Sequence, residues 1–104
     1  MNYAVIFSPE AEEQLSALYR YIASAASRNV AARYVEAIVF YCESLSESPL
    51  RGTMRDDIRP GLRITNYRGR VAIAFDVTGE QVSILGIFYG GQDYESILRD
   101  DVVN

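Results

Sequence analysis

The sequence predicts a two-layer α+β domain in which a helical hairpin covers one face of an antiparallel sheet of three or more strands. In the first half, apolar residues recur at spacings of three and four, which is typical of amphipathic helices. In the second half they alternate at a spacing of two, and glycine-containing turns separate the alternating segments. With 104 residues, the chain is expected to form one domain, residues 1–104.

The N-terminal residues predict a strand followed directly by a helix. Residues 3–7 alternate in the manner of a strand, and apolar side chains on both faces predict that both are partly buried. Ser8 and Pro9 then form a helix-start signal, because the serine oxygen can cap free amides and proline loses no hydrogen bond at the first helical position. One stripe of the helix is apolar, with Ala11, Leu15, Leu18 and Ile22.

The same spacing continues after a short break at residues 27–29 and predicts a second helix that ends near Ser48 and Pro49. A short join between two helices favours an antiparallel hairpin. Cys42 lies on the apolar stripe of the second helix and has no partner cysteine. We therefore expect a buried and unreactive thiol.

Residues 49–61 lose the periodicity and predict an irregular connection with room for a short edge strand. The following strand ends at Tyr67. Its alternation places Arg63 on the face opposite Leu62 and Ile64, and we interpret the Arg63 face as the more polar, half-exposed side.

The remaining elements are two inner strands and a short helix. Residues 68–69 predict a hairpin turn, 71–77 an inner strand, and 82–89 a last strand that is apolar on both faces from Ile84 onward and lies centrally in the sheet. Asp93 is expected to cap a short C-terminal helix, and residues 99–104 are expected to form a frayed tail.

Arginines cluster in one part of an acidic chain. Residues 51–70 hold six of the ten basic residues and two acids, a local charge of +4 in a chain of net charge −4. Arginine's planar fork suits carboxylates, so the cluster favours a partner-binding role over a merely solvated edge. Strand alternation is expected to place Arg63 on the more polar face, and the hairpin is expected to bring its flanks near Arg70. The candidate partner-binding residues are Arg55, Arg59, Arg63, Arg68, Arg70, Tyr19 and Tyr67.

The composition disfavours catalytic and metal chemistry. The chain has no histidine, which removes the usual general base near neutral pH and the commonest transition-metal ligand. We expect no catalytic residues, no metal site and no cofactor, and we interpret Asp56 and Asp57 as part of a solvated turn. No apolar run is long enough to cross a bilayer, so a cytoplasmic location without membrane partners is expected.

The order of these elements, together with several short strings, resembles the RelE/ParE superfamily of toxins from bacterial type II toxin-antitoxin systems, with the ParE branch most similar. The resemblance extends over nearly the whole chain, and no single string is diagnostic. The matching strings are Phe7-Ser8-Pro9-Glu10-Ala11, Tyr21-Ile22-Ala23, Ala32-Arg33-Tyr34, Pro49 with Gly52, residues 55–63, and Ile87-Phe88-Tyr89-Gly90-Gly91.

The resemblance implies a toxin that a cognate ParD-like antitoxin neutralises in a hetero-oligomer, which reaches operator DNA only through the antitoxin. The ParE branch further implies that the toxin binds and poisons DNA gyrase without chemistry of its own. The alternatives are a RelE-like ribosome-dependent mRNA endoribonuclease and a decayed, non-toxic interaction domain. The nuclease is disfavoured because residues 81–89 include no basic side chain and Gln92 stands where relatives commonly have arginine.

Overall fold

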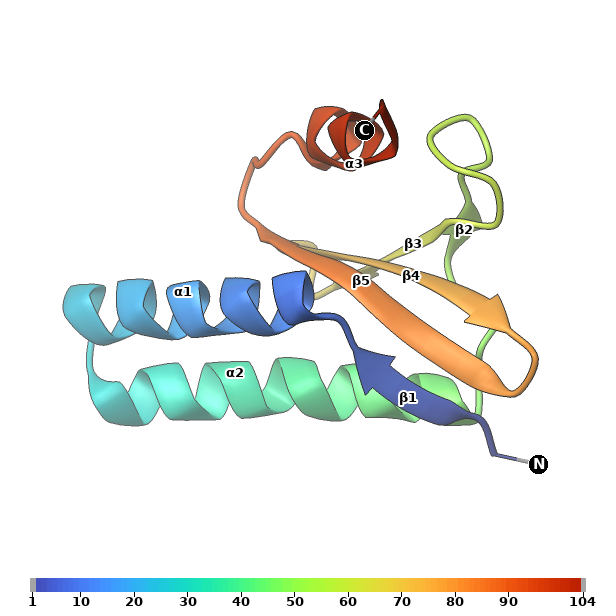
Figure 1. Ribbon diagram of the computed structural model, residues 1–104. Helices are drawn as coiled ribbons and strands as arrows, with labels where there is room; N and C mark the ends of the chain where they lie inside the picture. Colours follow the sequence, from blue (N-terminus) through green and yellow to red (C-terminus); the bar gives the residue numbers. More distant parts are fainter. Residues whose placement is uncertain (1, 104) are drawn as a thin grey trace.

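The computed structural model describes the backbone of residues 2–103 and the side chains as far as Arg99. It confirms the predicted α+β class (Figure 1). The predicted tail, residues 99–104, falls largely outside the described side chains, and Asn104 lies outside the described residues. The elements are β1 (Ala4–Phe7), α1 (Pro9–Ala25), α2 (Arg28–Glu43), the 3-10 turn η1 (Ser44–Ser46), β2 (Thr53–Met54), β3 (Arg63–Tyr67), β4 (Val71–Thr78), β5 (Gln81–Tyr89) and α3 (Tyr94–Val103).

The strands form one sheet in the order β1-β5-β4-β3-β2, with β1 parallel to β5 and every other pair antiparallel. The inner positions of β4 and β5 confirm the sequence analysis, and β2 is the short edge strand for which residues 49–61 left room. The prediction that both faces of the first strand are partly buried was wrong. Because β1 is an edge strand, Ala4 and Ile6 are exposed on the face away from the helices.

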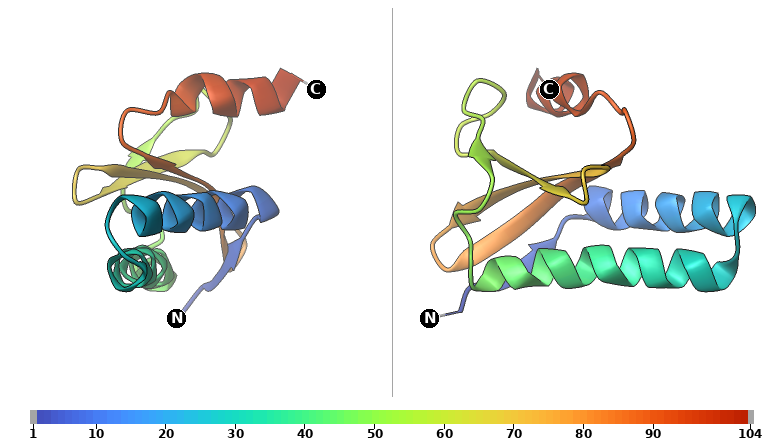
Figure 2. Two further views of the ribbon diagram at one scale, coloured as in Figure 1. Left: turned by 90° about the vertical axis from the view of Figure 1, so that its left-hand side faces the viewer. Right: turned by 180° about the vertical axis from the view of Figure 1, so that it is seen from behind.

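The helical hairpin lies on one face of the sheet, and both views in Figure 2 show α1 and α2 side by side. As predicted, Ser8 caps α1, its Oγ accepting a hydrogen bond from the Ala11 amide at 3.0 Å. Ser27 caps α2 in the same way. The apolar stripes of both helices meet the sheet in the main core, which includes Leu15, Leu18, Ile22, Ile38, Ile73, Phe75 and Ile84.

Cys42 is fully buried in this core, as predicted. Burial raises the pKa of its thiol to about 12, because the thiolate is poorly solvated there. The second helix ends at Glu43, earlier than the sequence predicted, and tightens into η1. The Ser44 hydroxyl donates to the Tyr41 carbonyl at 2.6 Å at this transition.

On the opposite face of the sheet, α3 and the connection between β2 and β3 pack over a second hydrophobic cluster, which is smaller than the main core (Figures 1 and 2). The sequence predicted α3 but did not place it. Leu98 is its buried anchor, with 2% of its surface exposed, and Asp93 caps the helix, as predicted, by accepting from the Ser96 amide. The buried residues of this second cluster are Ile58, Leu62, Ile64, Ala74, Phe88 and Leu98.

The predicted hairpin turn between β3 and β4 is confirmed. The Arg70 amide donates to the Tyr67 carbonyl at 3.2 Å, and Tyr67 pairs with Val71. Arg68 and Gly69 have positive φ angles of 53° and 72°, as the two central residues of a type I′ turn require. The turn therefore presents the arginines on either side of Gly69 at one end of the sheet.

Candidate interaction surface

Two of the predicted partner-binding arginines join the β2–β3 connection to α3. Arg55 donates to both carboxylate oxygens of Asp57, at 2.9 and 2.7 Å, and to Glu95 at 2.8 Å. These hydrogen bonds, more than the charges alone, lower the pKa of Asp57 to about 2 and raise the pKa of Arg55. Arg59 donates to the carbonyl of Leu98 at 3.2 Å. Both guanidinium groups thus have partners within the chain.

Arg63 is also bound within the chain. Its guanidinium donates to the carbonyls of Leu50 at 2.6 Å and Arg51 at 3.2 Å, and so ties the segment after η1 to β3. Arg63 does lie on the face opposite Leu62 and Ile64, as predicted.

That face is half-exposed at both ends, as predicted, because Arg63 and Tyr67 are each only partly buried. Its centre packs against α2. Thr65, two residues along, is 6% exposed and hydrogen-bonds the Tyr41 hydroxyl at 2.9 Å. The hairpin brings the C-terminal flank of Arg63 to Arg70, as predicted, because Tyr67 pairs with Val71 and its carbonyl accepts from the Arg70 amide. Arg63 pairs with Phe75, and it lies four residues, roughly 13 Å at the usual strand rise, before the turn that begins after Tyr67.

The other two predicted arginines, Arg68 and Arg70, lie exposed at the β3–β4 turn. Among the residues whose side chains are described, neither guanidinium forms a hydrogen bond or ion pair with the chain. The Arg68 guanidinium lies over the ring of Tyr67, with 5.5 Å between its central carbon and the ring centroid. This end of the sheet therefore offers positive charge that no carboxylate among the described side chains neutralises.

Tyrosines from four elements surround the turn. Tyr67 of β3 and Tyr89 of β5 are both paired with Val71 of β4, so they lie on one face of the sheet on either side of β4. The Tyr89 ring contacts Tyr34 of α2 and Tyr21 of α1, with centroids 6.0 and 6.2 Å apart. We call this region the tyrosine–arginine surface; it consists of Tyr21, Tyr34, Tyr67, Tyr89, Arg68 and Arg70.

Two observations describe the polarity of the tyrosine–arginine surface. Burial raises the pKa of Tyr34, while the positive charges of Arg70 and Arg68 act on the same hydroxyl in the opposite direction. Tyr21 is 61% exposed, an unusual exposure for an aromatic ring beside a core. Rings, hydroxyls and fixed positive charges are suited to binding a protein surface that presents carboxylates.

Tyr19 is not part of this surface. It is half-buried and lies with Val35 along the groove between α1 and α2, on a different side of α1 from Tyr21. Of the seven residues that the sequence singled out, the tyrosine–arginine surface includes Tyr67, Arg68 and Arg70.

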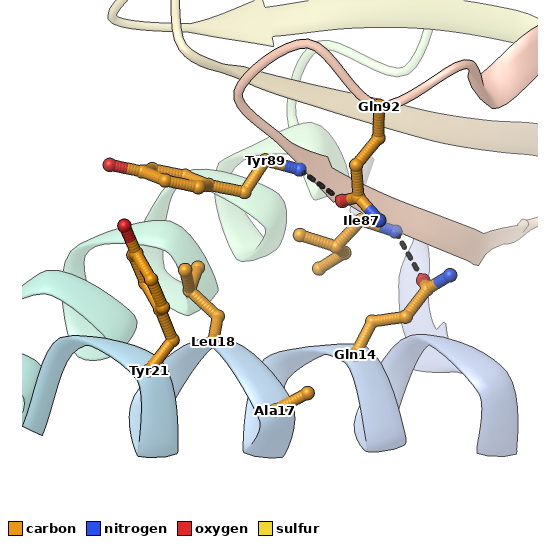
Figure 3. A pocket seen from close by; sticks show the side chains of 7 residues that line it. All are labelled: Gln14, Ala17, Leu18, Tyr21, Ile87, Tyr89 and Gln92. Carbon is orange, nitrogen blue, oxygen red and sulfur yellow. Dashed lines mark hydrogen bonds between the residues drawn. The ribbon is translucent and has the colours of Figure 1, made fainter. Parts of the chain in front are cut away.

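Sequence reasoning missed a pocket between α1 and the end of β5 (Figure 3). Gln14 Oε1 accepts from the Ile87 amide at 2.6 Å, and Gln92 Oε1 accepts from the Tyr89 amide at 2.8 Å. We call this hollow of about 270 Å³ the α1–β5 pocket; its lining is Gln14, Ala17, Leu18, Tyr21, Ile87, Tyr89 and Gln92. Gln14 and Ile87 are 73 positions apart, so no local pattern could have indicated their contact.

No cluster of three potential metal ligands occurs among the described residues. Within residues 2–103, no helix is long and apolar enough to span a membrane. The described groups of the tyrosine–arginine surface are guanidinium groups, which donate hydrogen bonds, and phenol rings, which offer a hydroxyl and an aromatic face. This chemistry is suited to binding.

Comparison with known families adds the decisive observation. Residues 5–94 match the family described as the ParE toxin of the type II toxin-antitoxin system parDE. The chain belongs to this family. The match covers α1, α2, strands β2 to β5, residues 5–7 of β1 and the tyrosine–arginine surface.

Solved structures agree with the family assignment. The chromosomal ParDE toxin-antitoxin system from P. aeruginosa includes a chain that is 25% identical, with a TM-score of 0.73, covering 85% of this chain and 96% of that one. A chain of the RelBE2 toxin-antitoxin complex from Mycobacterium tuberculosis is 21% identical, with a TM-score of 0.64, covering 88% and 95%. The second likeness shows the fold alone. No curated protein matches the chain.

Proposed function

We propose that this ParE-family toxin acts in the cytoplasm by binding and inhibiting DNA gyrase, and that a ParD-like antitoxin neutralises it. The observation that supports this most strongly is the family match over residues 5–94. A chromosomal ParDE system also provides a solved structure of similar fold.

The arrangement of the arginines favours binding over catalysis. Cleavage of RNA through its 2′-hydroxyl would need several cations or donors aimed at one developing charge, together with a group that moves protons. Arg55, Arg59 and Arg63 are instead directed at carboxylates and carbonyls of the chain itself. Arg68 and Arg70 remain available to attract and orient an anionic partner.

Purified toxin in gyrase supercoiling and DNA-cleavage assays tests the target. We expect loss of supercoiling or accumulation of cleaved DNA as toxin is added. The double variant Arg68→Ala/Arg70→Ala should weaken this effect about tenfold or more, as for two hot-spot residues. Arg20→Ala is the matched control, because Arg20 is an exposed arginine of α1 whose partner is Glu13. Normal gyrase activity at saturating toxin would overturn the proposed target.

Binding of the antitoxin is expected to depend on salt, because exposed charge pairs are screened as ionic strength rises. A short reading frame beside the toxin gene, with a DNA-binding start and an acidic tail, is the protein to test. Isothermal titration at 50 and 300 mM salt should show weaker binding at the higher salt and a smaller salt effect in the Arg70→Ala toxin. If neither the higher salt concentration nor the Arg70→Ala substitution changes the affinity, Arg70 is not part of the antitoxin interface.

The second candidate is a ribosome-dependent mRNA endoribonuclease, which the fold shared with the RelBE2 complex keeps open. Expression without antitoxin separates the possibilities. Growth arrest with intact messages and altered plasmid topology supports gyrase as the target, whereas codon-specific cuts in translated messages would identify the ribosome. Normal growth at high expression would identify a non-toxic interaction domain.

A further inference from the structure

The outer edge of β5 is paired over only part of its length. The parallel pairing with β1 runs from Ala4–Gln81 to Phe7–Ile84, and the chain then turns into α1. Ser8 makes the last contacts, its amide and hydroxyl donating to the carbonyls of Ile84 and Leu85. The strand itself continues to Tyr89. Its last residues therefore have β4 on one side and, within residues 2–103, no strand on the other.

Two glutamine side chains occupy this open edge. The amides of Ile87 and Tyr89 point away from β4 and donate to Gln14 and Gln92, respectively (Figure 3). Ile87 and Tyr89 are two residues apart, which is the spacing at which one extended strand offers successive carbonyls to its neighbour. A glutamine side chain ends in a carboxamide, the same chemical group as a peptide bond. The edge thus already binds two peptide-like carbonyl groups.

The α1–β5 pocket lies where a side chain of such a strand would point. Residues that pair directly across two strands direct their side chains to the same face of the sheet. A residue opposite Ile87 or Tyr89 would therefore point toward α1 and into the pocket. Apart from the two glutamines, the lining consists of Ala17, Leu18, Tyr21, Ile87 and Tyr89, which suits one bulky apolar side chain.

We propose that the outer edge of β5 at Ile87–Tyr89 binds an extended peptide segment of a protein partner, whose backbone carbonyls displace the Gln14 and Gln92 carboxamides and whose bulky apolar side chain enters the α1–β5 pocket. In the free chain the two glutamines keep the edge from pairing with unrelated strands. Strand addition at a sheet edge gives affinity through the backbone and specificity through the pocket.

The probe is a phage-displayed library of random 12-residue peptides, selected on the full chain and counter-selected on Ala17→Phe. Ala17 is exposed on α1, so a phenylalanine there should fill the pocket without disturbing the core. We expect the selected peptides to share one bulky apolar position and to lose about tenfold or more in affinity for the Ala17→Phe chain. N-methylation along a synthetic selected peptide should weaken binding at every second residue, as strand pairing requires.

Replacing either glutamine should strengthen peptide binding, whereas Ala17→Phe should weaken it. Gln14→Ala and Gln92→Ala should each strengthen peptide binding about fivefold, because the peptide no longer has to displace an existing hydrogen bond. Gln81→Ala, at the β1-paired end of the same strand, is the matched control and should leave affinity unchanged. Thermal melts of all three establish that they are folded, and Gln92 lies outside any helix or strand.

The proposal is overturned if the selection returns no peptide that discriminates against Ala17→Phe. It is also overturned if N-methylation weakens binding at every third or fourth residue, which indicates a helix. If neither Gln14→Ala nor Gln92→Ala strengthens peptide binding, the idea that the peptide displaces the carboxamides is likewise refuted. None of these outcomes depends on whether gyrase is the target, because the peptides are selected on the chain alone.

Discussion

The structure predicts that Arg63 stabilises the fold, whereas Arg70 does not. Arg63→Ala removes two charge-assisted hydrogen bonds, to the carbonyls of Leu50 and Arg51. Hydrogen bonds to charged groups contribute about 1.5–3 kcal/mol each when well shielded. Leu50 is 70% exposed, so water can replace part of what is lost. We therefore expect Arg63→Ala to lower the free energy of unfolding by about 2 kcal/mol in total.

The assay is urea unfolding followed by far-UV circular dichroism, with thermal melts beside it. A loss of about 2 kcal/mol should lower the melting temperature by roughly 10 °C in a domain of this size and lower the urea midpoint at unchanged slope. Arg70→Ala should stay within about 0.5 kcal/mol of the parent, as exposed substitutions usually do. Arg63→Lys should recover about half of the loss, because an ammonium group can reach only one of the two carbonyls well.

Equal stability of Arg63→Ala and the parent chain would refute this reasoning. It would mean that the bonds to Leu50 and Arg51 contribute nothing beyond what water provides, and Arg63 would return to the set of residues available to a partner. A loss for Arg70→Ala as large as that for Arg63→Ala would contradict the division of the arginines into bound and exposed groups.

Three further predictions concern other positions. Burial raises the pKa of Cys42 to about 12, so at pH 8 iodoacetamide should label it only as fast as the chain unfolds, and rapid labelling of native protein would contradict the burial. Folding lowers the pKa of Asp57 from 3.8 to about 2. The ionised carboxylate therefore contributes its full stabilisation above about pH 4, and this stabilisation is lost as the pH falls through about 2. Asp57→Asn should remove this part of the acid dependence of stability in urea unfolding. Gly52→Ala should lower the free energy of unfolding by about 2 kcal/mol, and Gly61→Ala should lower it by about 1 kcal/mol. Both glycines have positive φ, but only at Gly52 would the new methyl group meet the backbone of β3. Equal losses of stability in chemical denaturation would show that this crowding plays no part.

Local chemistry explains what could be predicted from the sequence. A helix start depends on one hydroxyl and the amides three residues on, so Ser8 and Pro9 sufficed to place it. The β3–β4 turn depends on two residues that tolerate positive φ, and it formed at Arg68 and Gly69. The burial of Cys42 followed from the spacing of its helical stripe. Each of these features is determined within about one turn of chain.

The candidate site required contacts between distant segments. The alternation in residues 62–67 separates two faces correctly, but it does not state which face the helices cover or what lies beyond the other. In the folded chain α2 covers the face of Arg63, and α3 covers the face of Ile64. Arg63 thereby acquired carbonyl partners in place of solvent.

The sequence by itself determined the class of fold, the positions of its helices and strands, and the presence of a positively charged segment in an acidic chain. Only the tertiary structure decided which arginines remain free and that Gln14 and Gln92 meet the open edge of β5. The physical reason is that secondary structure follows from neighbours in sequence. Hydrogen-bond partners of long side chains depend instead on which segments the core packing brings together, and that is a property of the whole fold.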